Sequence, residues 1–468
     1  MSSLVLAFLL VPASESLSDS WRSRFAAGKV TPPEQFLLDQ ISAGKVADLR
    51  AAFPNEGDRV IRGAFLEEVL IGSRKDCSVH RNGVLIEGAV VRDAVDLRNV
   101  EIVHDTRLSR CVFEREVNFS KSAFENSFSV EGSVFKGEAC FYAMKVGRGV
   151  SIEGAVFHDR ANFSQVDVQG IFGAGASKFL HPSQPAEFIG CKAGGNAFFT
   201  NAIFGGPASF QYCQVADNLK LDGARFTNFV ELINFESMKV VGMASLTGAV
   251  FRGYVSFKDA TFNTLDLSDI EWPRHVYGEW LWFNGVTYQR IAAGSEKDSP
   301  DHLLELINRS ARRSAYSTDV YTGLVEFYRR EGYVRQANRF FIAQKQRERE
   351  EVLRGSAWGW SLFLDWFVGY GRSPERALFW SAAIVLFGIR VFRPGNMEPR
   401  LDNAKPDCYS PFWYSVDLFL PLVKLQDAEL WKPKDEPWFP RFWSRIHTML
   451  GWALIPIAVA AWTGMLEK

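Results

Sequence analysis

The residues with the clearest chemical potential are two opposite charges in an otherwise apolar segment near the C-terminus. Residues 411–425 read PFWYSVDLFLPLVKL and carry Asp417 and Lys424 seven residues apart, on one helix face unless Pro421 breaks the helix. An ionisable side chain at membrane depth is costly, and it either pairs with another charge or lines a water-filled path. The spacing therefore leaves two interpretations open: an interfacial ion pair, or the lining of a pore. The polar side chains that would join such a pore are Tyr414 and Ser415.

No other motif in the sequence predicts chemistry. The seven histidines are scattered, with neither HxxxH nor HExxH spacing, so no metal site is predicted. The six cysteines include no CxxC pair, a pattern that fits a reducing compartment. A GxSxG elbow and a GxxxxGKS/T loop are both absent, and the glycine-rich segment 170–179 is interpreted as a turn. We therefore predict no catalytic residue, no cofactor and no enzymatic activity.

An apolar segment precedes the two charges. Residues 377–389 carry no charge, and together with their flanking arginines and apolar residues they predict a membrane span over 376–392. An aromatic, amphipathic stretch over 358–370 comes just before it. This stretch predicts a helix that lies in the membrane interface.

A second apolar segment follows the two charges. Residues 449–466 are uncharged and have tryptophans near both ends, as in an aromatic belt, which predicts a second span over 447–466. Pro456 is expected to kink this span. Residues 357–468 thus predict a two-helix transmembrane domain, with 411–425 as a short re-entrant helix. The alternative for both spans is a pair of buried helices in a soluble domain.

Helical spacing also extends over 301–353, where Gly332 separates two segments. It predicts an α-helical hairpin within a linker over 273–356. The second segment ends in a basic run from Arg335 to Arg354. This run is either a solvated helix face or a charged surface next to a membrane, and in the second case the positive-inside rule places it in the cytoplasm.

The longest part of the sequence follows a different period. From Ile86 to Val168, large apolar residues recur at alternating steps of five and six. A helix requires 3.6 and a flat strand 2.0, so the chain is predicted to turn a corner at every step and form a solenoid. Four steps make 22 residues, and stacked coils would place phenylalanines of that spacing in a column. These phenylalanines are Phe113, Phe135, Phe157 and Phe179.

The same period sets the limits of the predicted solenoid. It continues to Leu267, so a mainly β fold is predicted over 84–272, with roughly eight coils. Two stretches blur the pattern, HPSQP at 181–185 and KAGGN at 192–196. Both are interpreted as loop insertions.

Residues 1–83 are expected to form a helical cap on the first coil, including a short helix over 57–71. The region opens with LVLAFLLV at 4–11, which is long enough for the apolar part of a signal peptide, although no Lys or Arg precedes it. Residues 1–14 are therefore interpreted as a signal peptide, a hydrophobic helix or the product of a mis-assigned start.

Several stretches resemble known families. GAVFHDRANFSQ (154–165) and GAVFRGYVSFKDATF (248–262) resemble degenerate pentapeptide repeats, which implies a right-handed quadrilateral β-helix. The pattern YxxLxxxYRRxGxxxxA (321–337) is similar to one helical hairpin of the tetratricopeptide kind. Together with 414–425 and 451–464, these stretches resemble a bacterial group of pentapeptide-repeat membrane proteins, which implies an inner-membrane location.

The order of span, short helix and span is also similar to two-span tetrameric cation channels. The chain departs from that family at the filter. QDAELWKPKDEPW stands where a TVGYG-like filter would follow the short helix, and GYG at 369–371 precedes the first predicted span.

Two functional hypotheses follow. In the first, the chain is a channel-like membrane protein with a cytoplasmic β-helix as sensor or docking rod; it must be a homo-oligomer, since two spans cannot enclose a pore. In the second, it is a membrane-anchored scaffold whose β-helix binds a partner protein and conducts nothing. The lipid bilayer is a partner in both. Nucleic acid is not, because the net charge is −1 and residues 81–269 hold 18 Lys and Arg against 21 Asp and Glu.

Overall fold

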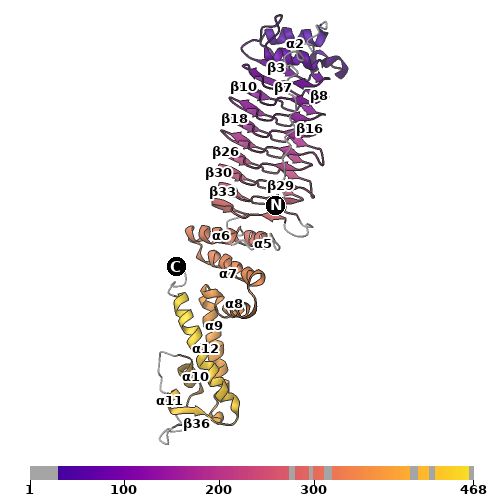
Figure 1. Ribbon diagram of the computed structural model, residues 1–468. Coiled ribbons are helices and arrows are strands. Elements are labelled where there is room, and N and C mark those ends of the chain that lie inside the picture. Colours follow the sequence, from indigo (N-terminus) through magenta and orange to yellow (C-terminus); the bar gives the residue numbers. More distant parts are fainter. Residues whose placement is uncertain are drawn as a thin grey trace, which may run out of the picture. The chain divides into compact units, whose positions relative to one another are not determined.

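The computed structural model describes residues 30–273, 280–294, 299–309, 319–400, 409–420 and 427–462. Residues 1–14, for which a signal peptide is one of three interpretations, lie outside these residues. The chain divides into two compact units, residues 1–314 and 315–468. The first contains a β-solenoid and the second is helical, as Figure 1 shows.

The solenoid predicted from the five-and-six period is confirmed. One coil contains β8 (Val112–Phe113), β9 (Val117–Asn118), β10 (Ala123–Phe124) and β11 (Phe128–Ser129). Each of these strands pairs in parallel with its counterparts in the neighbouring coils, so the coils stack in layers (Figure 1). Two of the three large sheets hold nine strands, which gives about nine turns rather than the eight expected.

The phenylalanine column is also confirmed. Parallel pairing aligns Phe135 with Phe113 on one side and with Phe157 on the other. The ring centroids of both pairs lie 4.8 Å apart, at interplanar angles of 6° and 5°. A second buried column contains Phe119, Phe141 and Phe163. Stacked rings therefore fill much of the solenoid interior.

The alternation of five and six residues has a cause in the backbone. Between Ile86 and Val168, each five-residue step turns at one residue with positive φ, and the six-residue steps turn without one. The residues with positive φ are Gly88, Asn99, Arg110, Lys121, Gly132, Ala143, Gly154 and Gln165. The left-handed conformation costs a non-glycine residue roughly 1–2 kcal/mol. The surrounding ladders of hydrogen bonds must therefore hold these corners in place.

The solenoid is longer than the period predicts. β2 (Val60–Ile61) pairs with β4 (Val90–Val91), so the stack begins within the cap region. β34 (Leu281–Trp282) and β35 (Thr287–Ala292) extend it beyond residue 272. The period does not predict these last strands, because the apolar residues there are no longer spaced at five or six residues. The added strands still bury some apolar side chains.

One of the two predicted insertions is wrong. HPSQP at 181–185 lies outside the strands, but KAGGN contains β22 (Lys192–Ala193), which pairs with the coils on both sides. The buried residues of this coil include Ala193 and Ala197. Their small side chains hide the apolar period and border a small apolar cavity.

Two helices cover the first coil. α2 (Pro32–Ser42) and α4 (Gly63–Ile71) both belong to the cap region, and α4 lies within the helix expected over 57–71. The carboxylate of Glu67 in α4 accepts a hydrogen bond of 2.7 Å from the backbone N–H of Asp96 in the first coil. The cap therefore satisfies a donor that the end of the stack would otherwise leave open.

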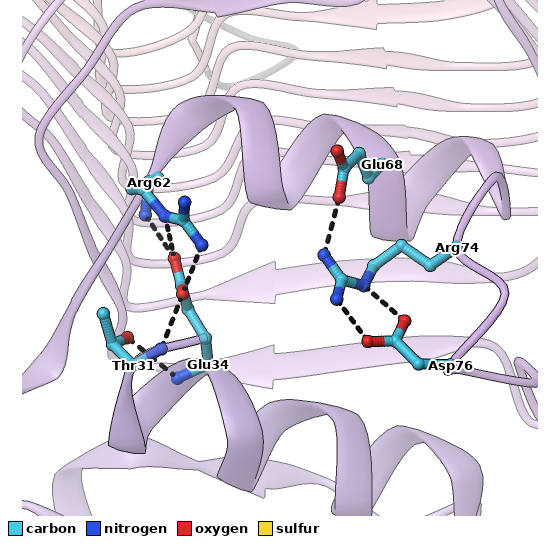
Figure 2. Close-up of polar contacts among 6 residues, drawn as sticks. All are labelled: Thr31, Glu34, Arg62, Glu68, Arg74 and Asp76. Carbon is cyan, nitrogen blue, oxygen red and sulfur yellow. Dashed lines mark hydrogen bonds and ion pairs between the residues drawn. The ribbon is translucent and has the colours of Figure 1, made fainter. Parts of the chain in front are cut away.

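A buried carboxylate joins α2 to the start of α4. Glu34 is fully buried, and its two oxygens accept hydrogen bonds of 2.8 Å from Nε and Nη2 of Arg62 (Figure 2). Its Oε2 also accepts the backbone N–H of Thr31 at 3.0 Å. Figure 2 shows a second cluster nearby, in which Arg74 lies between Glu68 and Asp76.

Replacing Glu34 with glutamine is expected to lower the free energy of unfolding at pH 7 by about 1–3 kcal/mol, because Arg62 loses its buried counter-charge and one of its two acceptors. Burial opposes ionisation of Glu34, but the hydrogen bonds from Arg62 and Thr31 outweigh it and lower its pKa. A carboxylate with a lowered folded-state pKa stabilises the fold above its unfolded pKa, and the effect is lost as pH falls through the folded value. The difference in free energy of unfolding between the wild type and Glu34→Gln, measured with urea, should therefore shrink below about pH 4.

The exposed Glu56 supplies the matched control. Glu56→Gln should change the free energy of unfolding by no more than about 0.5 kcal/mol. Equal effects of the two substitutions would contradict a structural role for the buried pair.

The helical unit begins with a hairpin. α6 (Asp319–Arg330) and α7 (Val334–Glu351) are joined at Gly332, and the rings of Tyr328 and Phe340 stack between them at 5.3 Å. α8 (Gly355–Val368) follows.

The longest helices that follow α8 are packed together. α10 (Pro411–Phe419) packs against both α9 (Pro374–Val391) and α12 (Trp438–Trp462). α9 and α12 run antiparallel, because Phe387 contacts Trp443 while the start of α9 packs near Leu454. A short antiparallel pair, β36 (Met397–Pro399) and β37 (Trp431–Pro433), lies in the same unit.

The structure does not support the two predicted membrane spans. Residues 376–392 and 447–462 are helical, but within the described residues no helix combines the length and the apolarity that crossing a bilayer requires. In α9 the cause is composition, because Glu375, Arg376 and Arg390 all fall within its 18 residues. Residues 463–466 of the second predicted span lie outside the described part.

Candidate functional site

The site predicted from the sequence lies on α10. Tyr414 and Ser415 are buried, and Asp417 is half-buried on the same helix. Lys424 lies outside the described residues, so both the ion pair and the pore lining stay predictions. Pro456 lies inside α12, which continues as a helix beyond it.

Ser415 contacts a histidine that the sequence did not single out. His447 of α12 is fully buried, and its Nε2 lies 3.0 Å from the carbonyl oxygen of Ser415 and 3.3 Å from its Oγ. The Ser415 hydroxyl donates to the carbonyl of Val385 in α9 at 2.9 Å. The absence of a side chain at Gly388 leaves space for the Ser415 hydroxyl, since a Cβ at that position would lie 2.2 Å from Ser415 Oγ. This contact joins α9, α10 and α12 at one point.

The serine and histidine are not arranged for nucleophilic catalysis. The serine proton is engaged by a backbone carbonyl, and neither residue is exposed to solvent. His447 Nδ1 has no hydrogen-bond partner among the described residues, so no carboxylate there orients the ring. Burial lowers the pKa of His447, which favours the neutral imidazole at pH 7. We infer that the pair positions helices.

A second polar cluster, also missed from the sequence, connects α7, α8 and α9. Asp365 of α8 is buried and accepts hydrogen bonds from Arg349 at 2.9 Å and from Gln346 at 3.0 Å, while Arg376 lies 3.5 Å away. The side chains of Arg347 and Arg349 are only 13% and 11% exposed. These two members of the basic run are therefore internal ion-pair partners and not part of a solvated face.

The helical unit exposes apolar side chains where a soluble helix would carry polar ones. α9 buries Ala377 and Ile384, whereas Leu378, Phe379 and Leu386 are 53%, 66% and 64% exposed. Positions seven or eight residues apart lie on one face of a helix. The outer face of α9 is thus as apolar as its inner face.

α12 and α8 expose side chains of the same kind. On α12 they recur every three to seven residues, the spacing of a single stripe. Trp366 of α8 lies next to α9, because its carbonyl accepts a hydrogen bond of 3.0 Å from Trp380 Nε1. We call this set the apolar surface: Trp360, Trp366, Leu378, Phe379, Leu386, Phe387, Trp438, Phe442, Met449, Trp452 and Val459.

Arginines border the apolar surface. On α9 the exposed apolar face lies between Arg376 and Arg390. On α12 the exposed Arg445 and Arg441 lie about one and two turns before Met449, respectively. A belt of apolar side chains edged by arginine and tryptophan is typical of surfaces that contact lipid.

The described residues offer little for metal or thiol chemistry. Within them, no group of three or more His, Cys, Asp or Glu side chains is placed to hold a metal ion. Cys111 is buried in the solenoid, where burial raises the pKa of its thiol to about 12. Such a thiol stays protonated and unreactive at neutral pH.

Comparison of the chain with protein-family models, with curated proteins and with solved structures finds no significant match.

Proposed function

We propose that the chain is a scaffold that binds a lipid bilayer through the apolar surface of its helical unit and presents its β-solenoid to a partner protein. The observation that carries the proposal is the exposure of aromatic and aliphatic side chains, 50% or more for most of the apolar surface. Monomeric soluble proteins rarely expose large contiguous apolar patches, and those that do occur mark interaction sites.

A bilayer fits this surface better than a second copy of the chain does. The exposed apolar side chains are distributed over three helices, and α10 adds Phe412 and Trp413. One symmetric protein interface covers a single patch, whereas a bilayer covers every face at the same depth. The bordering arginines and tryptophans also suit head groups better than they suit the centre of a protein interface.

The solenoid supplies a rigid surface for the partner protein. One shallow groove on it is lined by side chains of both signs, including Arg107, Glu131, Glu153 and Lys220. A partner with a complementary mixture of charges would fit there. The repeat resemblance supports a right-handed, quadrilateral coil of the pentapeptide-repeat kind, and we include that geometry in the proposal.

The channel-like alternative requires assembly into a homo-oligomer and a pore lined by 411–425. An inner-membrane location with the solenoid in the cytoplasm is expected in both alternatives. These points stay predictions.

Flotation with phosphatidylcholine vesicles tests the bilayer contact. The full chain is expected to float with the vesicles, and the double variant Leu378→Glu, Leu386→Glu should reduce the vesicle-bound fraction at least tenfold. Removing one leucine from an apolar environment costs about 1.5–3 kcal/mol, and a tenfold change in binding corresponds to about 1.4 kcal/mol. Both leucines are exposed, so the fold should stay intact.

Phe229 and Val230 of the solenoid supply the matched control. They are 71% and 66% exposed, and replacing both with glutamate should leave flotation unchanged. The proposal is wrong if the wild-type chain stays at the bottom of the gradient, or if the leucine variant floats as well as the wild type. A wild-type oligomer that does not float and that dissociates in the leucine variant would assign the apolar surface to a second copy.

A further inference from the structure

A groove between α10 and α12 combines cationic and apolar walls. α10 contributes one wall and α12 the other, and Pro433 of β37 and Arg400, which follows β36, complete the lining. Its lining consists of Arg400, Tyr414, Leu418, Pro433, Ser444, Arg445, Thr448, Met449, Trp452 and Ala453. Six of these residues lie on one face of α12, at positions 444, 445, 448, 449, 452 and 453.

The polarity of the groove changes along α12. Ser444, Arg445 and Thr448 give hydroxyl groups and a guanidinium to its first part, whereas Met449 and Trp452 make the next part apolar. Eight residues of helix separate the two ends, a rise of about 12 Å. The groove therefore matches a molecule with a polar head and an apolar tail.

The charge of the polar end is positive. Within the described part of the chain, Arg400 and Arg445 form no ion pair, whereas Arg441 one turn earlier pairs with Asp435 at 2.5 Å. Arg400 and Asp417 both lie near the buried Tyr414, so one carboxylate offsets part of the positive charge of the groove. The remaining positive charge favours an anionic head group.

We propose that this groove binds the anionic head group of a phospholipid, with the acyl chains along Met449 and Trp452. The inference rests on the proposed function, because the bilayer that contacts the apolar surface is the source of the lipid. Guanidinium groups bind phosphate with paired hydrogen bonds. The Ser444 and Thr448 hydroxyls donate to backbone carbonyls of α12, so the two arginines supply the donors. Met449 and Trp452, which belong to the apolar surface, are 68% and 58% exposed, so the lipid tail would continue directly into the bilayer.

Comparison of two vesicle compositions tests the groove. The full chain is titrated with vesicles of phosphatidylcholine alone and with vesicles that also contain phosphatidylglycerol. The wild type should bind the anionic vesicles more tightly, by roughly fivefold for each arginine in the groove. Arg400→Gln with Arg445→Gln should lose most of this preference, and its affinity for phosphatidylcholine should fall less than its affinity for the anionic vesicles.

The control removes the same charge elsewhere in the helical unit. Arg390 and Arg393 at the end of α9 are exposed and lie outside the groove. Arg390→Gln with Arg393→Gln should retain more of the preference than the groove variant does. Equal losses in the two variants would assign the preference to general surface charge and overturn the groove. If the wild type binds both kinds of vesicle equally, the groove proposal is wrong but the proposed function stands. If the wild type binds neither kind, both the groove proposal and the proposed function are wrong.

Discussion

Phe157→Ala is expected to destabilise the solenoid by about 3–5 kcal/mol, the usual cost of removing a buried aromatic ring. Phe157 is 1% exposed and stacks on Phe135 at 4.8 Å and on Phe179 at 4.9 Å. It also contacts Phe163 edge to face at 5.8 Å. Removal of the ring leaves a cavity bordered by coils whose stacked backbones limit collapse.

Native-state hydrogen exchange of peptides from residues 130–180 measures this effect. Each coil of a solenoid contacts only its neighbours, so exchange should increase most in the coils next to Phe157. Phe229→Ala is the matched control, because its ring is 71% exposed and its loss should change stability by no more than about 0.5 kcal/mol. Similar exchange in the two variants would contradict the stacked column.

Gly451→Ala is expected to destabilise the helical unit by about 1–3 kcal/mol, the typical cost of overpacking. A Cβ at this position of α12 would lie 2.0 Å from the carbonyl oxygen of Phe419 at the end of α10. The obstacle is backbone, so a side-chain rotation cannot relieve it. α12 would have to move away from α10, which would also disturb the contact of His447 with Ser415. Thermal unfolding followed by the helical circular dichroism signal measures the change.

Gly359→Ala, in the same helical unit, is expected to raise its stability instead of lowering it. Gly359 lies in α8, and a Cβ there would have no neighbour within 4 Å. Alanine in an open helical position stabilises by up to about 1 kcal/mol relative to glycine. If Gly451→Ala behaved like Gly359→Ala, the close approach of α12 to α10 would not exist.

The solenoid could be predicted because its period repeats over many coils. Large residues such as Phe113 and Phe135 recur at every coil, and a sustained period of five and six fits neither helix nor flat strand. The prediction failed where the inward residues are small, as at Ala193, and at the C-terminal end, where the spacing changes before β34. The strand pairing at these places depends on neighbouring coils, which local sequence does not reveal.

The helical unit was predicted less completely, for a different reason. Apolar segments around α9 and α12 indicate helices, but their composition does not predict which side chains face the interior of the unit. Asp417 could be singled out because it is a charge in an apolar segment. No local sequence pattern predicts that Asp365 and His447 are buried. Their roles depend on contacts with residues 16 to 32 positions away in the sequence.

Hydroxyl-radical footprinting of the full chain, with and without phosphatidylcholine vesicles, tests the contact between the apolar surface and the bilayer most directly. Trp366, Phe379, Met449 and Trp452 are 58% to 68% exposed and carry side chains that react readily, as do Tyr212 and Phe229 of the solenoid at 59% and 71%. We predict that vesicles protect the first four and leave the two solenoid residues unchanged. Continued labelling of the first four in the presence of vesicles, or their protection in the free protein, would contradict a bilayer as the partner of this surface.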